Sequence, residues 1–217
     1  MYRCNGDLIG TYGGYNGGTL NDRPTNGRLL WDDGQDCQNG GNGNCRTILE
    51  EDFQSYRVWD RIAQVSSQWE TWDRGREGSS QDAVVMNGNA QGTEKHLHLV
   101  NDRVQDVVYK LGNQRSGRYE LNFDMLMIDA GYFNIQEDQN NRVGGGLFGV
   151  KFFDDGRYEV RTNGGGRSSL VSYSTSRWID ISMDIDLDRN RYNLTVDGRT
   201  FQLTSVRGFD LLGGINF

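Results

Sequence analysis

Residues 179–188 alternate strictly between apolar and polar side chains. The apolar positions are Ile179, Ile181, Met183, Ile185 and Leu187, and the residues between them are Asp or Ser. A period of two over this length predicts a β-strand with one face in an apolar core and the other face in water.

The same alternation continues beyond a polar break. Residues 192–196 alternate again, and Asp197-Gly198 is a two-residue signal for a β-hairpin. Phe201 then begins a returning strand. Three antiparallel strands, each polar on one face, are typical of an all-β sandwich.

Other segments show strand patterns of the same kind. They include residues 95–100, 107–112, 119–127 and 131–136, and a hairpin that turns at Asp155-Gly156. We expect about eleven to thirteen strands with frequent turns and no amphipathic helix, which predicts a two-sheet antiparallel jelly roll.

Residues 1–47 differ from the rest of the chain because they are rich in Gly, Asn and Asp and poor in apolar residues. We expect an irregular arm, or the end of a preceding domain, that lies on the sandwich without a core of its own. The sandwich itself is expected at residues 48–217.

Composition narrows the class of protein. The chain has 217 residues, 30 of them Gly, and a net charge of -7. This charge disfavours nucleic acid and anionic membrane surfaces as partners. No apolar stretch is long enough for a membrane-spanning helix, and no signal peptide is visible, so we expect a mature or truncated piece of an extracellular or cell-surface protein.

Three cysteines are present. Cys37 and Cys45 bracket a flexible Gly/Asn loop, and we expect a disulfide between them. Cys4 is then left for an intermolecular bond, for a partner outside this sequence, or as a free thiol.

Several blocks of the sequence resemble a known type of module. The blocks are DFQSYRVWDRIAQVSSQWETWD, GSSQDAVVMNGNAQGTEKHLHL, DVVYKLG, SGRYELNFDMLM, AGYFNIQ and YSTSRWIDISMDIDLDRNRYNLTVDG. Together they resemble the laminin-G-like, concanavalin A-like jelly-roll modules of secreted Bacteroidota proteins, which often precede a type IX secretion sorting domain. The resemblance covers residues 50–217 and implies a fold and a compartment more than an activity.

The resemblance also implies a departure from the pattern. In such modules a segment like GGINF is typically followed by one more strand, whereas this sequence stops at Phe217. We therefore expect a sandwich that lacks its last strand, either because the sequence is a truncated piece of a longer protein or because another chain donates a strand to the open edge.

The sequence gives little support for catalysis. The spacing of paired carboxylates that a glucanase on this fold would need is absent, and the residues of an alginate-lyase-like site are incomplete. The acidic row Asp180, Asp184, Asp186 and Asp188 is expected to be a solvated face balanced by arginines such as Arg189. His96 and His98 are expected to be solvent-facing strand residues, with a metal pair as the alternative. We predict that the chain is not an enzyme.

Calcium is the one cofactor that the sequence suggests. Asp32, Asp33 and Asp36 precede the Gly/Asn loop, and Asp73, Glu77 and Asp82 flank the first long loop of the sandwich. Ca²⁺ binds six to eight oxygens, which such loops can supply. Ordinary acidic turns are the alternative.

A glycan surface is the candidate ligand site. Sugar rings stack on exposed aromatic side chains beside amides and carboxylates. The candidates are Trp69, Trp72, Tyr132, Asn134 and Gln136, with Trp59 and Tyr158 as further aromatics. The alternative is that the aromatics cover the edge of the core and that Tyr132, Asn134 and Gln136 form an ordinary polar sheet face.

The predicted function is therefore a non-catalytic extracellular module for surface adhesion or glycan binding within a larger secreted protein. Its partner would be a glycan or a surface protein. A structural role, with self-association through the N-terminal arm or an open C-terminal edge, is the second hypothesis, and a polysaccharide-cleaving enzyme is the third.

Overall fold

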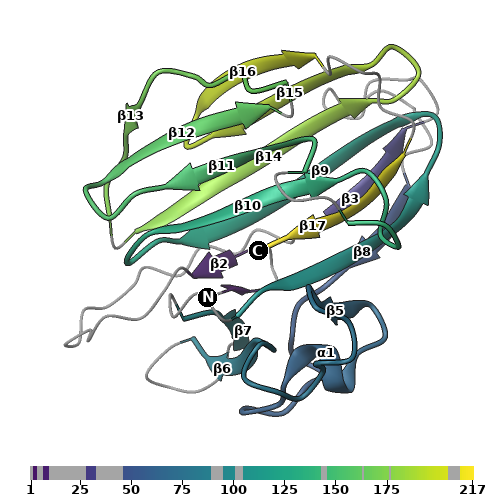
Figure 1. The fold of residues 1–217 in the computed structure, drawn as a ribbon, viewed down its shortest axis with the longest axis vertical. Coiled ribbons are helices and arrows are strands. Elements are labelled where there is room, and N and C mark those ends of the chain that lie inside the picture. Colours follow the sequence, from purple (N-terminus) through teal and green to yellow (C-terminus); the bar gives the residue numbers. More distant parts are fainter. Residues whose placement is uncertain are drawn as a thin grey trace.

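The computed structural model describes residues 2–3, 7–9, 28–32, 46–88, 95–100, 105–142, 146–162, 164–175, 177–204 and 211–217, with side chains from Leu49 onward. These residues form two β-sheets packed face to face and one short helix, α1 (Ile62–Val65). The strands of each sheet are mostly antiparallel (Figure 1). The predicted all-β sandwich is thus confirmed. No helix in the described part of the chain is long and apolar enough to cross a membrane.

One sheet has seven strands. Their spatial order is β13 (Val171–Ser172), β12 (Arg157–Thr162), β11 (Phe148–Phe152), β10 (Gly131–Gln136), β17 (Leu212–Asn216), β8 (Val107–Gln114) and β5 (Trp69–Thr71). Figure 1 shows β17 between β10 and β8, and it pairs with both. β17 is therefore an interior strand. The hypothesis of self-association through an open C-terminal edge needs an unpaired strand, and the paired residues of β17 do not provide one.

The other sheet has ten strands. The main order is β16 (Arg199–Thr204), β15 (Arg191–Val196), β14 (Trp178–Asp186), β9 (Arg118–Leu126), β2 (Asp7–Ile9), β1 (Tyr2–Arg3), β7 (Lys95–His98) and β6 (Val84–Asn87). In addition, β3 (Arg28–Asp32) pairs with β9 and with β4 (Arg46–Glu50). The two segments β2 and β3 lie end to end along one side of β9, which pairs with β14 on its other side.

The N-terminal segment thus contributes strands to the sandwich. The expected division between residues 47 and 48 falls inside β4, and β1, β2 and β3 extend the ten-stranded sheet. Whether this segment also belongs to a preceding domain stays a prediction. Cys4, Cys37, Cys45, Asp33 and Asp36 lie outside the described residues, as does the side chain of Asp32, so the disulfide and the first calcium loop stay predictions too.

The alternating pattern around residue 180 folds as predicted. Along β14, Ile179, Ile181, Met183 and Ile185 are at most 2% exposed. The hairpin between β15 and β16 turns at Asp197 and Gly198, whose φ angles are 53° and 77°. Positive φ at both central residues is the geometry that a type I′ hairpin requires, and Asp-Gly adopts it readily. The turn at Asp155-Gly156 between β11 and β12 is confirmed as well.

The core fills the space between the sheets. Phe123 of β9 meets Phe133 of β10 edge to face, with ring centroids 5.2 Å apart, and Phe148 of β11 lies 5.6 Å from Tyr192 of β15. Aromatic contacts of this kind add about 0.5–1.5 kcal/mol each beyond the area that they bury. They join the two sheets at positions that alternate with outward-facing polar residues.

The histidines of β7 were expected to face solvent, and this is wrong for His96, which is 2% exposed. His98 is also largely covered, and burial lowers its pKa to about 4. Leu97 and Leu99 face the core as predicted, but the other face of this strand is covered as well.

His98 should make the fold sensitive to acid. Between pH about 6.5 and about 4, the unfolded chain binds a proton at this residue that the folded chain does not bind, so stability falls as the pH falls through that window. We expect the melting temperature to drop more between pH 7 and pH 5 in the wild type than in His98→Gln. The raised pKa values of Glu51, Asp82 and Asp106 act in the opposite direction, but they are shared by both proteins and cancel in the comparison. Equal drops in the two proteins would contradict the assignment.

Candidate functional site

A row of polar positions crosses the outer face of the seven-stranded sheet. Asn134 of β10 lies opposite Asn216 of β17 on one side and opposite Gly149 of β11 on the other. Gly149 in turn lies opposite Arg161 of β12. Because neighbouring side chains along a strand point to opposite faces, Phe133 and Ile135 enter the core while the residues of this row point away from it.

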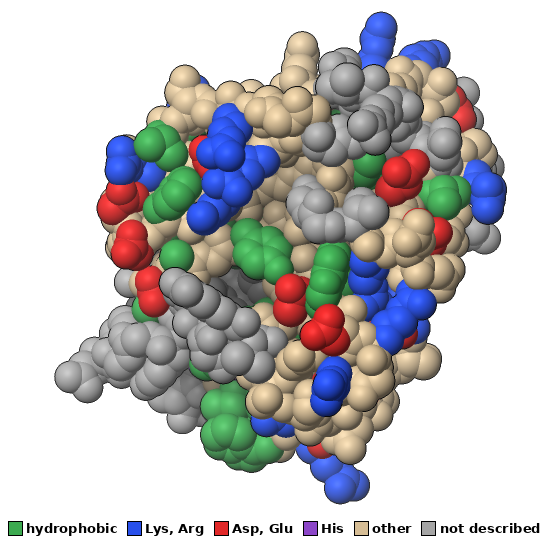
Figure 2. All heavy atoms as spheres, in the orientation of Figure 1, with side chains coloured by type: hydrophobic (Ala, Val, Ile, Leu, Met, Phe, Trp, Pro, Cys, Tyr) green, Lys and Arg blue, Asp and Glu red, His purple; other side chains and the backbone are tan. Residues whose placement is uncertain are grey.

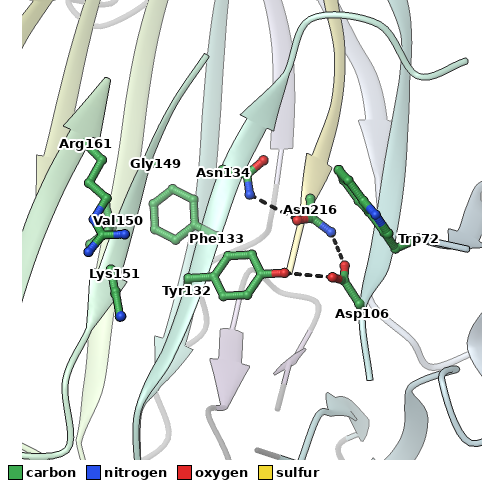
Figure 3. Close-up of a pocket in the computed structure, with 10 residues that line it drawn as sticks. All are labelled: Trp72, Asp106, Tyr132, Phe133, Asn134, Gly149, Val150, Lys151, Arg161 and Asn216. Carbon is green, nitrogen blue, oxygen red and sulfur yellow. Dashed lines mark hydrogen bonds between the residues drawn. The ribbon is translucent and has the colours of Figure 1, made fainter. Parts of the chain in front are cut away.

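A chain of hydrogen bonds joins the polar side chains on this face. Gln136 donates to Asn134 Oδ1, Asn134 Nδ2 donates to Asn216 Oδ1 at 3.0 Å, and Asn216 Nδ2 donates to Asp106 Oδ1. The Tyr132 hydroxyl donates to the other oxygen of Asp106 at 2.8 Å. Figure 3 shows Tyr132 and Asn216 both directed at this carboxylate. Each amide nitrogen therefore donates to the next residue in the same direction, and this series of hydrogen bonds ends at the carboxylate of Asp106.

The chain of amides lies beside a cavity of about 430 Å³. This volume is within the roughly 300–1,000 Å³ that is usual for small-ligand sites. The cavity combines two aromatic side chains, two amides, one carboxylate and two cations with backbone of β10 and β11; its lining residues are Trp72, Asp106, Tyr132, Phe133, Asn134, Gly149, Val150, Lys151, Arg161 and Asn216.

The segment 137–142 crosses the outer face next to this cavity. The backbone N–H of Gln139 donates to Asn113 beyond β17, at 2.9 Å. Arg142 donates to the carbonyl oxygens of Thr71 and Trp72 at 2.5 and 2.8 Å and forms an ion pair with Glu70. The segment therefore joins β10 to β8 and β5. Gln136, the last residue of β10 before this segment, is fully buried.

Burial sets the protonation behaviour of the site. It raises the pKa of Asp106, although hydrogen bonds from Asn216 and Tyr132 act against the rise. Burial and the neighbouring Asp106 charge also raise the pKa of Tyr132. The phenol thus stays protonated at neutral pH and donates to the carboxylate. The hydrogen-bonding groups of this network are thus held in place beside the Tyr132 ring, and Tyr132 is 41% exposed.

The structure brings together three of the five predicted glycan residues. Trp72, Tyr132 and Asn134 line the cavity. Gln136 lies behind them, where its side chain holds Asn134. Trp69 does not share this surface: it is 3% exposed, in the core, because β5 turns Trp69 and Thr71 inward and Glu70 outward.

The two further aromatics lie elsewhere. Tyr158 is 1% exposed and packs in the core, so it cannot be a surface residue. Trp59 is 71% exposed, but it is not among the residues that line the cavity.

Four residues of the site were missed from the sequence: Asp106, Lys151, Arg161 and Asn216. Lys151 and Arg161 alternate with Val150 and Val160 in the predicted hairpin. The sequence pattern therefore predicts that their side chains point away from the core. Their proximity to Asn134 was not, because it depends on which strand lies beside which. Asp106 and Asn216 meet through the contact of β8 with β17, more than a hundred residues apart in the chain.

The described calcium candidates do not converge. No group of three potential metal-ligating His, Cys, Asp or Glu side chains occurs among the described residues. Asp82 is fully buried, and its oxygens accept backbone N–H groups from Ala63, Gln64 and Gly78. Asp73 accepts from Gln81, and Glu77 accepts from Thr71 and Gly75. These contacts are those of acidic turns, and calcium binding stays a prediction.

The acidic row on β14 is balanced by arginines. Asp186 pairs with Arg189 at 3.0 Å and Asp184 lies 3.5 Å from Arg118. Asp180 and Asp188 are exposed as expected, but Asp186 is only 8% exposed, so the expectation is wrong for this one position.

Comparisons with known proteins give no family assignment. No family model matches the chain, and no curated protein matches it. Among solved structures, a sialidase matches with a TM-score of 0.43 and 10% identity, over 69% of this chain and 13% of that one. The binding domain of botulinum neurotoxin serotype G matches with a TM-score of 0.36 and 14% identity, over 69% and 42% of the two chains.

Domains LG4-5 of the mouse laminin alpha1 chain match with a TM-score of 0.30 and 18% identity, over 51% of this chain and 30% of that one. The chain thus spans less than half of each of these solved chains. Scores this low carry no argument about function, and the two-sheet architecture rests on the strand pairings given above.

Proposed function

We propose that this chain is an extracellular binding module and that it binds a glycan in the cavity on the outer face of the seven-stranded sheet. One observation carries the proposal: a hydrogen-bonded chain of amides that ends on Asp106 lies along an open cavity that also contains Trp72 and Tyr132. Fixed polar groups beside aromatic rings are what recognition of a sugar ring needs.

The fixed network is what distinguishes this face from an ordinary polar surface. Asn134 and Asn216 are 8% and 1% exposed, so their amides are held in one orientation by their partners. A ligand that binds groups already held in place loses less conformational entropy at the site. Adhesion to a surface would follow if the glycan belongs to a cell or a matrix, and a protein partner would be reached through its attached sugars.

A glycan array tests this function. We expect the wild type to bind a restricted set of saccharides, and Trp72→Ala and Tyr132→Ala each to weaken that binding by at least about tenfold, since each removes a stacking surface worth roughly 1.4 kcal/mol or more. Trp59→Ala is the matched control, because Trp59 is more exposed than either but does not line the cavity. Equal losses in all three variants, or no saccharide bound by the wild type, would contradict the proposal.

A further inference from the structure

One wall of the cavity is cationic. Lys151 of β11 and Arg161 of β12 both line it, and Arg167 lies next to them. The one carboxylate in this group is Glu159, which pairs with Arg161 and lies 3.8 Å from Arg167. Within the described residues of this wall, three cations thus stand beside one anion, and two of them are paired with it. Lys151 forms no ion pair within the described part of the chain; its Nζ lies 5.1 Å from the centre of the Phe153 ring.

The positive charge of this wall is opposite in sign to the net charge of the whole chain, which is -7. Figure 2 shows a cluster of Lys and Arg side chains on one side of a hollow in this face, with Asp and Glu side chains both beside the cluster and across the hollow from it. In Figure 3, Lys151 and Arg161 lie on one side of Tyr132, and Asp106 lies on the other. The site therefore has a positive end and a negative end, with an aromatic ring between them.

Gly149 connects the two ends. It occupies the position between Asn134 and Arg161 in the cross-strand row. A Cβ at this position would lie 2.3 Å from the carbonyl oxygen of Phe133, so no other residue fits without a shift of the backbone. The row thus has bare backbone at this point, and a ligand can extend from the amides to the cations along the floor of the cavity.

We propose, on the basis of the glycan site above, that the ligand is a saccharide that carries a carboxylate. Its carboxylate pairs with Lys151 and Arg161, its ring lies against Tyr132, and its hydroxyls donate to Asp106. A neutral sugar would leave the ammonium of Lys151 without an anion while it lost water, which costs free energy in a partly enclosed site. The polarity of the cavity also fixes the direction in which such a sugar binds.

The test compares oligosaccharides of uronic acids with their carboxyl-reduced counterparts, which have the same rings and no charge. We expect a panel of galacturonate, glucuronate and mannuronate oligomers to contain a ligand that the wild type binds at least about tenfold more tightly than its reduced form by calorimetry. Lys151→Met should reduce that difference, with Arg161 left as the remaining cation, and raising the salt concentration should weaken only the acidic ligand. Arg189→Met, which removes a cation from the turn between β14 and β15 of the other sheet, is the matched control.

The outcomes separate the two proposals. If the wild type binds acidic and reduced oligomers equally, the glycan site stands and the assignment of an acidic ligand is overturned. If neither form of any sugar in the panel binds, the assignment of an acidic ligand is overturned as well. The glycan array then tests separately whether the cavity binds any saccharide. If Arg189→Met lowers the preference as much as Lys151→Met does, the effect is one of net charge, and the assignment to this wall is wrong.

Discussion

Replacing Trp69 by alanine is expected to lower the free energy of unfolding by about 3–5 kcal/mol. The indole is 3% exposed and lies 4.8 Å from the Tyr109 ring and 5.9 Å from the Phe53 ring, measured between centroids. Its Nε1 also donates to Glu51 at 3.2 Å. The substitution therefore leaves a cavity in the core and removes one of the donors to a carboxylate whose pKa is already raised by burial.

Trp72 is the natural control for this change. It stands three residues away, beyond the end of β5, on the side of the cavity, and its backbone N–H donates to the Asp106 carbonyl at 2.8 Å, a bond that alanine keeps. We expect Trp72→Ala to change stability by no more than about 1 kcal/mol. Urea unfolding followed by fluorescence or circular dichroism measures both.

The two tryptophans should separate stability from binding. The folded fraction of Trp69→Ala should keep its affinity for the ligand, because the indole does not reach the outer face, whereas Trp72→Ala should keep its stability and lose affinity. Equal destabilisation by the two substitutions would mean that the faces of β5 are assigned wrongly, and with them the position of the cavity.

The sequence could predict the strands better than the site. The alternation along β14 and β9 and the turns at Asp155-Gly156 and Asp197-Gly198 depend on local chemistry, and the structure confirms them. Tyr132 and Asn134 were also placed on one strand face from their spacing alone. A period of two tells which residues share a face, but it does not tell which face is covered.

Two errors, at Trp69 and His96, have that one cause, and a third has another. Trp69 stands in a polar stretch, yet its strand packs against β8 and turns the indole inward. His96 alternates with core leucines and is buried on the other face of β7. Asn216 and Asp106 could not be linked to Asn134 because the position of β17 between β10 and β8 is set by long-range packing and has no local signal.

Replacing Asp82 by alanine is the second change with a large expected effect, a loss of about 2–4 kcal/mol in stability. The carboxylate is fully buried and accepts the backbone N–H of Ala63 at 3.0 Å, of Gln64 at 3.1 Å and of Gly78 at 2.9 Å. Alanine leaves the N–H groups of Ala63 and Gly78 without this acceptor, and each costs roughly 1 kcal/mol or more, whereas the N–H of Gln64 keeps the Arg61 carbonyl oxygen at 3.1 Å. The short helix α1 and the loop around Gly78 would lose the side chain that holds them together.

Asp73→Ala is the matched control for this loop. Among the described residues, its exposed carboxylate accepts only the side-chain amide of Gln81, so we expect a change within about 0.5 kcal/mol. The pair also tests the calcium hypothesis, because a bound ion would make the stability of the wild type depend on calcium and both substitutions would remove that dependence. Melting curves with excess calcium and with a chelator make the comparison. If the carboxylate of Asp82 serves to hold the backbone, the curves of the wild type coincide and only Asp82→Ala melts early; a calcium-dependent shift that both variants lose would assign these carboxylates to a metal instead.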